Sequence, residues 1–216
     1  DGARFRSSRA LSPERKLLGL FCGSRTSEIK GLVPLMIDVA KDIKTHYPDV
    51  ICVVPTLPKW KEVLEAQFKE ADVPAIVTCD PAERWDAFRA PDVAIAVSGT
   101  VALEIALAGT PHVIVYKMHT WTWEIIRRVV KTKFAHLGNI LLGHLVYPEF
   151  IQDNAEADKI APVVLNLLNS DMERKIQMET SRKILHMLEP NQNEKASDKA
   201  AAFILSYDRA IPKFDT

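Results

Sequence analysis

The chain has 216 residues, the length of one large domain or two small ones. Hydrophobic residues make up 47% and charged residues 26%, which is close to the globular average and excludes a fibrous or wholly disordered protein. The 28 basic and 28 acidic residues balance, so no net charge attracts nucleic acid or anionic lipid, and any basic site must be local.

Residues 1–16 are expected to be a linker or a cut point. They open without a methionine, and arginine and serine residues precede the first apolar run without the hydrophobic core of a signal peptide. We therefore expect this chain to be the later part of a longer protein.

Short apolar runs alternate with longer amphipathic segments from Leu17 onward, which is typical of strand–helix–strand units and a parallel sheet. The predicted strands are Leu17–Cys22, Val50–Val54, Ala75–Thr78, Val93–Val97 and His112–Tyr116. The predicted helices that follow them are Ser27–His46, Lys59–Ala71, Pro81–Arg89, Thr100–Ala108 and Trp121–Lys131. This pattern predicts an α/β protein with a Rossmann-like parallel sheet over residues 17–190.

The carboxyl-terminal part is expected to be a helical tail. Residues 148–206 contain no strand-like run, and the predicted helices are Asp158–Asn169, Met172–Leu188 and Glu194–Tyr207. The breaker Pro190–Asn193 separates the last helix, so residues 191–216 are predicted to form a distinct crossover helix and tail. Its apolar stripe favours pairing with another surface, a homodimer included; the stripe consists of Ala200, Ala201, Phe203, Ile204 and Tyr207.

The predicted helix Trp121–Lys131 has two interpretations. Apolar residues cover more than half of its circumference, which favours a buried helix. Tryptophan combined with arginine and lysine also fits contact with a membrane surface. We expect a cytoplasmic location, with peripheral contact to the inner membrane left open.

The turn after the first predicted strand has the composition of an anion site. Gly23 allows close backbone approach, Ser24 offers a hydroxyl, and Arg25 has the fork that fits phosphate oxygens. The alternative is a capped helix with Ser27 as the N-cap and Arg25 in solvent.

The turn Ser98-Gly99-Thr100 opens a helix in which Glu104 is the single charged residue. Thr100 and Glu104 are four residues apart and therefore share one face. The helix N-terminus with Thr100 suits a diphosphate, and Glu104 suits a pair of sugar hydroxyls. The alternative is a structural salt bridge to Glu104 and an ordinary cap at Thr100.

Several other site classes have no signature here. Cys22, Cys52 and Cys79 lie in or at the end of apolar runs without a CxxC pair, which favours buried reduced thiols. The chain lacks the GxGxxG, GxxxxGK[ST], GxSxG and HExxH motifs, and it has no basic, aromatic-rich surface for nucleic acid. The sequence therefore predicts a phosphate-and-sugar site without a metal or a cofactor.

These two turns, with Arg127–Lys133, Asn139–Gly143 and Pro148–Gln152, resemble the lipid-A-disaccharide synthase family over Leu17–Tyr207. The resemblance implies the carboxyl-terminal, nucleotide-sugar-binding half of a GT-B glycosyltransferase. It implies transfer of 2,3-diacylglucosamine from UDP to 2,3-diacylglucosamine 1-phosphate. By the same resemblance, the catalytic base and most of the acyl-chain surface lie in a missing amino-terminal domain, and no catalytic residue is assigned here.

The resemblance also implies the residues that bind the UDP-sugar donor. The diphosphate contacts correspond to Gly23, Ser24, Arg25, Ser98, Gly99 and Thr100, the ribose contact to Glu104, and the donor side of the cleft to Asn139, Glu149 and Gln152. Cys22 and Gly138 depart from the family pattern, which has proline at both places, so the geometry of these loops is open.

Two other functions stay open. The chain could be part of another GT-B enzyme that uses UDP-N-acetylglucosamine, such as the lipid-II-forming transferase or the 2-epimerase. It could also be a non-catalytic module that binds a nucleotide sugar.

Overall fold

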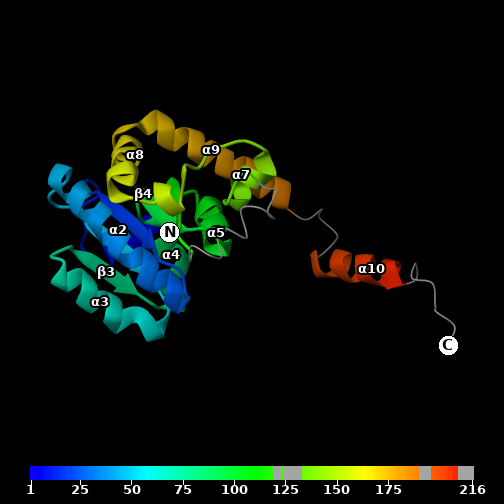
Figure 1. The fold of residues 1–216 in the computed structure, drawn as a ribbon, viewed down its shortest axis with the longest axis horizontal. Helices are drawn as coiled ribbons and strands as arrows, with labels where there is room; N and C mark the ends of the chain where they lie inside the picture. Colours follow the sequence, from blue (N-terminus) through cyan, green and yellow to red (C-terminus); the bar gives the residue numbers. More distant parts are fainter. Residues whose placement is uncertain (119–122, 124–132, 190–195, 209–216) are drawn as a thin grey trace. The chain divides into compact units, whose positions relative to one another are not determined.

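A computed structural model describes residues 1–118, 123, 133–189 and 196–208, and it divides the chain into two units, Asp1–Ile184 and Leu185–Thr216. The described part of the first unit contains a parallel sheet (Figure 1), and its six strands have the order β3-β2-β1-β4-β5-β6. Its strands are β1 Leu17–Phe21, β2 Ile51–Pro55, β3 Ala75–Thr78, β4 Val93–Val97, β5 His112–Tyr116 and β6 Glu149–Ile151. The predicted Rossmann-like sheet is therefore confirmed, and its first five strands begin and end within one residue of the prediction.

Helices cover both faces of this sheet. The longer helices are α2 Thr26–His46, α3 Lys61–Glu70, α5 Thr100–Ala108, α8 Ala157–Asn169 and α9 Asp171–Leu188. The shorter ones are α1 Gly2–Ser7, η1 Pro58–Trp60, η2 Pro81–Glu83, α4 Arg84–Arg89, α7 Leu137–Leu142 and η3 Gln152–Asn154. The predicted helix Trp121–Lys131 falls almost wholly outside the described residues.

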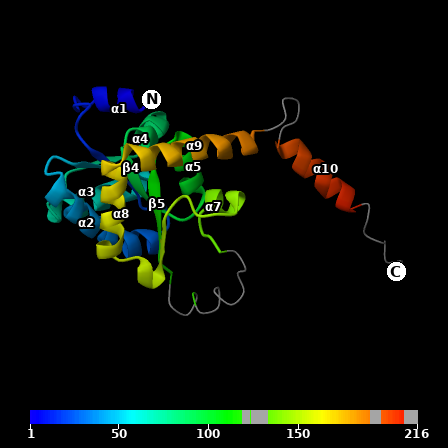
Figure 2. The same ribbon diagram turned by 90° about the horizontal axis from the view of Figure 1, so that it is seen from above.

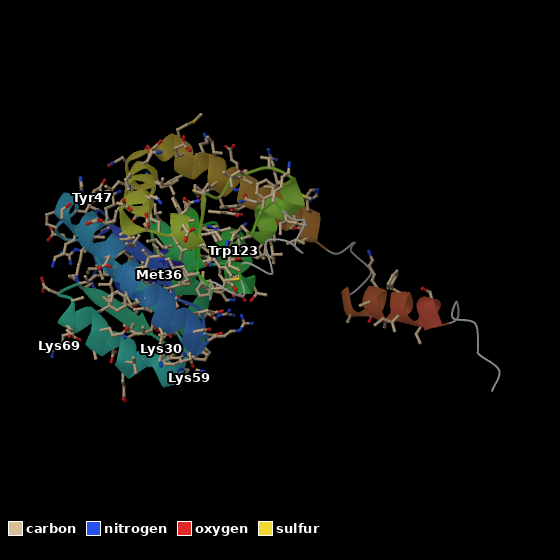
Figure 3. The ribbon with its side chains drawn as sticks, in the orientation of Figure 1. Lys30, Met36, Tyr47, Lys59, Lys69 and Trp123 are labelled. Atoms are coloured by element: carbon tan, nitrogen blue, oxygen red, sulfur yellow. The ribbon has the colours of Figure 1, made fainter. Side chains whose placement is uncertain are left out.

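The alternation of side chains along each strand divides the core between the two faces. On one face, Leu18 and Ile95 pack with apolar residues of α2, α3 and α8. The helices α2 and α8 lie side by side there (Figures 1 and 2). Met36, labelled on α2 in Figure 3, is fully buried. On the other face, Ala94 and Ala96 pack with Ile105 of α5 and with Phe88 of α4.

The strand β6 was not predicted. Residues 148–206 were expected to be helical only, but Glu149–Ile151 pairs in parallel with β5, with Ile114 opposite Glu149 and Tyr116 opposite Ile151. A strand of three half-buried residues is too short to show a period of two in the sequence. Its pairing comes from the hydrogen-bonding edge of β5, a tertiary contact that no local pattern encodes.

Residues 1–16, for which a linker or cut point is expected, contain the helix α1 Gly2–Ser7. The helix α1 buries Phe5 against Leu17, Val53 and Ala87. Arg6 donates to the carbonyl of Ala90 at 3.0 Å and to Asp92 at 2.9 Å, which fastens α1 to the segment before β4. The domain boundaries themselves stay a prediction.

The second unit, described by itself, contains the helix α10 Ala196–Asp208. The side chains of Phe203, Ile204 and Leu205 are 69%, 65% and 63% exposed. This helix agrees with the predicted Glu194–Tyr207 over the residues that are described.

Candidate functional site

A cavity of about 460 Å³ lies at the carboxyl ends of the strands, where ligands bind in open α/β sheets. Residues that follow β1, β2 and β3 line it together with the first residues of α5. Of the predicted donor-site residues, those that line this cavity are Gly23, Ser24, Arg25, Thr100 and Glu104. The parallel strand order thus joins two turns that are 75 residues apart in the sequence, Gly23 and Ser98 being their first residues.

The turn after β1 is organised by Glu28, a residue that the sequence analysis did not single out. Its Oε2 accepts hydrogen bonds from the backbone N–H groups of Ser24 at 2.9 Å and of Arg25 at 3.1 Å. Its Oε1 accepts from Nη1 of Arg25 at 3.1 Å. The N-cap of α2 is Arg25 and not Ser27. The sequence signal for this cap is Glu28, the glutamate three residues after it, as in a capping box.

Gly23 is required at its position for two reasons. Its φ is +86°, a conformation that costs L residues energy, and a Cβ atom there would collide with Oε2 of Glu28. The carboxylate of Glu28 therefore sits where an anionic ligand of this turn would bind, and such a ligand has to displace it. The side chain of Arg25 is 77% exposed and can turn toward a ligand at little cost.

The second turn separates the functions of Ser98 and Thr100. The Oγ of Ser98 donates to the carbonyl of Ala135 at 2.9 Å, and Thr100 lines the cavity. Gly99, the N-cap of α5, has a φ of +149° and makes no side-chain cap. Within the described residues, the first N–H groups of α5 consequently have neither an intrahelical acceptor nor a side-chain cap, as an anion site requires.

Glu104 lies one turn further along α5 and is paired with Arg84. The Nη2 of Arg84 donates to Oε2 of Glu104 at 2.6 Å, and both residues line the cavity. The side chains are 47% and 31% exposed, so the pair is open to solvent and to a ligand. The structural salt bridge weighed for Glu104 is thus present, and its carboxylate nevertheless faces the cavity.

Asn139, Glu149 and Gln152 do not line the cavity but hold the loops around β6 together. The fully buried Asn139 donates from Nδ2 to Glu149 at 2.8 Å and accepts from the N–H of Val146 at 2.9 Å. Glu149 accepts from the N–H groups of Ala135 and His136, and Gln152 bonds both backbone groups of Met118. Ala135 also accepts from Ser98, so Asn139 and Glu149 support the second turn through it. Gln152 instead joins the segment after β5 to the segment after β6.

A buried imidazole pair lies beneath this network. Burial lowers the pKa of His112 to about 3 and also lowers the pKa of His136, so both are neutral. Nδ1 of His136 accepts from the N–H of Gly138, which leaves its proton on Nε2, 3.1 Å from Nε2 of His112. The Nδ1–H of His112 donates to the carbonyl of Thr110 at 2.8 Å.

The cysteines are not all buried as predicted. Burial raises the pKa of Cys22 and of Cys52 to about 12, which keeps both thiols protonated and inert. Cys79 is half-buried and lines the cavity. No cluster of three or more metal-ligating side chains is found in the part of the chain that the structure describes.

Among residues 1–118, 123, 133–189 and 196–208, no helix has the combined length and hydrophobicity needed to cross a bilayer.

Comparison with solved structures supports the fold. WaaG, a glycosyltransferase involved in lipopolysaccharide biosynthesis, matches with a TM-score of 0.60 at 16% identity, over 94% of this chain and 50% of that one. The carboxyl-terminal domain of a glycosyl transferase group 1 family protein (LpcC) from Francisella tularensis matches with a TM-score of 0.57 at 16% identity, over 87% and 92%. At these identities the likeness shows the fold alone, which is that of one half of a GT-B enzyme.

Comparison of sequences identifies the family. A family model described as lipid-A-disaccharide synthetase matches residues 3–203. The lipid-A-disaccharide synthase of Rhodospirillum centenum is 37% identical over 83% of this chain and 45% of its own length. That of Paramagnetospirillum magneticum is 36% identical over 94% and 53%, so the chain spans about half the length of these relatives. The chain belongs to the lipid-A-disaccharide synthase family.

Proposed function

We propose that this chain is the donor-binding half of a glycosyltransferase of lipid A biosynthesis. The complete enzyme would transfer 2,3-diacylglucosamine from UDP to 2,3-diacylglucosamine 1-phosphate and release UDP. The observation that carries the proposal is the cavity in which the Gly23–Arg25 turn, the uncapped N-terminus of α5 and Glu104 meet, in a chain of this family.

The cavity residues divide the recognition of UDP between them. The diphosphate would accept hydrogen bonds from the first N–H groups of α5 and from Arg25, and Glu104 would accept from the ribose hydroxyls. Guanidinium and N–H groups that face the diphosphate also stabilise the charge that develops as UDP leaves. No metal ion is needed for this step in the proposal.

The acceptor side is proposed to lie outside this chain. An inverting transfer needs a general base on the acceptor hydroxyl, and we assign that base and most of the acyl-chain surface to an amino-terminal domain. The chain by itself should then bind UDP without catalysing transfer. Contact with the inner-membrane surface, where the acylated substrates reside, and a cytoplasmic location belong to the same proposal.

Two measurements test the proposal. Titration calorimetry of the 216-residue chain with UDP, with and without EDTA, should show the same binding in both solutions. A chimera that joins the amino-terminal half of the Paramagnetospirillum magneticum relative to this chain should form the disaccharide from UDP-2,3-diacylglucosamine.

The outcomes separate the alternatives. A chimera that accepts UDP-N-acetylglucosamine in place of the diacylated donor would favour another GT-B enzyme. If the chain binds UDP but the folded chimera forms no disaccharide, a non-catalytic binding module is favoured. A chain that does not bind UDP would overturn the proposal.

A further inference from the structure

The ion pair between Arg84 and Glu104 belongs to the cavity and not to the core. Arg84 is the first residue of α4, and its guanidinium lies 5.1 Å from the centre of the Phe88 ring one turn later. It reaches Glu104 of α5 at 2.6 Å with both side chains partly exposed. Exposed ion pairs contribute little to folding stability, so stability does not account for this contact.

The charges around the cavity give the pair a consequence for binding. The charged residues that line it are two cations, Arg25 and Arg84, and three anions, Glu28, Asp80 and Glu104. Each guanidinium is already paired with a carboxylate of the same cavity. A free carboxylate of Glu104 beside a diphosphate would repel it, because like charges a few ångströms apart disfavour each other.

The geometry also fixes how Glu104 can meet a sugar. Arg84 holds Oε2, and within the described residues no hydrogen bond is found to Oε1. This hydrogen bond to Oε2 restricts the rotation of the carboxylate, so that Oε1 is oriented for an incoming hydroxyl donor. The contact of the guanidinium with the Phe88 ring uses none of its N–H donors, so Arg84 can keep this contact while Nη2 bonds Glu104.

We propose that Arg84 is a positioning residue for ribose recognition, which orients Glu104 and cancels its charge so that the cavity accepts a nucleoside diphosphate. The inference rests on the proposed function, because it assumes that UDP occupies this cavity. Arg84 itself need not contact the nucleotide.

The test compares Arg84→Gln, Glu104→Gln and the double variant in the 216-residue chain by titration calorimetry. The ligands are UDP, 2′-deoxy-UDP and inorganic diphosphate. Arg89→Gln is the matched control, since Arg89 lies on the same helix α4, is exposed, and does not line the cavity. Thermal unfolding of each variant shows whether it is folded.

Arg84→Gln should weaken the binding of UDP and of diphosphate by about tenfold, within the range of coupling between neighbouring charged groups. Adding Glu104→Gln should restore the binding of diphosphate, because the repelling carboxylate is gone. The preference for UDP over 2′-deoxy-UDP should be lost in both single variants and stay lost in the double variant. Arg89→Gln should behave as the wild type.

Other results would overturn the inference. If diphosphate still binds weakly to the folded double variant, Arg84 contacts the phosphates directly. If Arg84→Gln keeps the full preference for the ribose hydroxyl, Glu104 does not depend on Arg84. A wild-type chain that binds none of the three ligands would instead contradict the proposed function.

Discussion

At the residue scale, Arg25 is the cation of the site that can reorient toward a ligand at the lowest energy cost. Its side chain is 77% exposed, while that of its partner Glu28 is 13% exposed, so Arg25 is the mobile end of this contact. Arg25→Ala should weaken UDP binding by about 1 to 3 kcal/mol, the size of a charge-assisted hydrogen bond to an anion. Titration calorimetry measures the affinity of each variant for UDP. The control for loss of one positive charge is Lys30→Ala, on the exposed side of α2 (Figure 3). Equal affinity of Arg25→Ala and wild type would return Arg25 to the role of a solvated helix cap.

Two glycines near the start of α2 form a matched pair for stability. Gly23 has a φ of +86° and no room for a Cβ atom, whereas a Cβ at Gly31, inside α2, would meet nothing within 4 Å. Gly23→Ala should destabilise the fold by about 1–2 kcal/mol, and Gly31→Ala should stabilise it by about 0.5–1 kcal/mol. Urea unfolding measures both. A Gly23→Ala variant as stable as wild type would show that the turn does not need this conformation.

At the element scale, the buried imidazoles at the start of β5 and at the N-cap of α7 make stability depend on pH. The pKa of His112 is about 3 in the folded chain and near 6.5 when the side chain is exposed, so the unfolded chain binds more protons between these values. The free energy of unfolding should therefore fall as the pH drops below about 6.5 toward 3. Urea unfolding at several pH values should show that the free energy of unfolding depends less steeply on pH in His112→Gln than in the wild type. His46→Gln, at an exposed position, is the control for loss of a histidine. If the free energy of unfolding depends on pH equally steeply in His112→Gln and in the wild type, His112 is not the source of this pH dependence.

The elements also show which features the sequence could predict. Five strands and the helix Thr100–Ala108 were predicted because each has its own apolar pattern. The strand β6 and the contact of Arg84 with Glu104 were not, because both depend on which elements become neighbours after folding. The two turns of the site were found from their place after strands, as the parallel sheet requires. Asn139, Glu149 and Gln152 came from the family resemblance, and the backbone groups that each of them bonds could be seen only in three dimensions.

At the scale of the whole molecule, the helix α10 is predicted to mediate association. Ile204 and Leu205 are 65% and 63% exposed in the second unit, and exposed apolar area favours burial against another surface. We expect the chain to form a homodimer that dissociates when the residues after Pro190 are removed. Light scattering of both forms measures this. A monomer in both cases would exclude α10 as the association element.

The lengths of the two outer strands restrict how such a dimer can form. In the described sheet, β3 has four residues and β6 has three, and each pairs on one side with its neighbour. Unpaired backbone groups along an outer strand can template a strand from another chain, and very short outer strands offer few of them. Growth of the sheet from one molecule into the next, the first step toward fibrillar aggregation, is therefore disfavoured in this fold. At high local concentration, molecules of this chain should associate through the side chains of their helices, and such contacts are reversible.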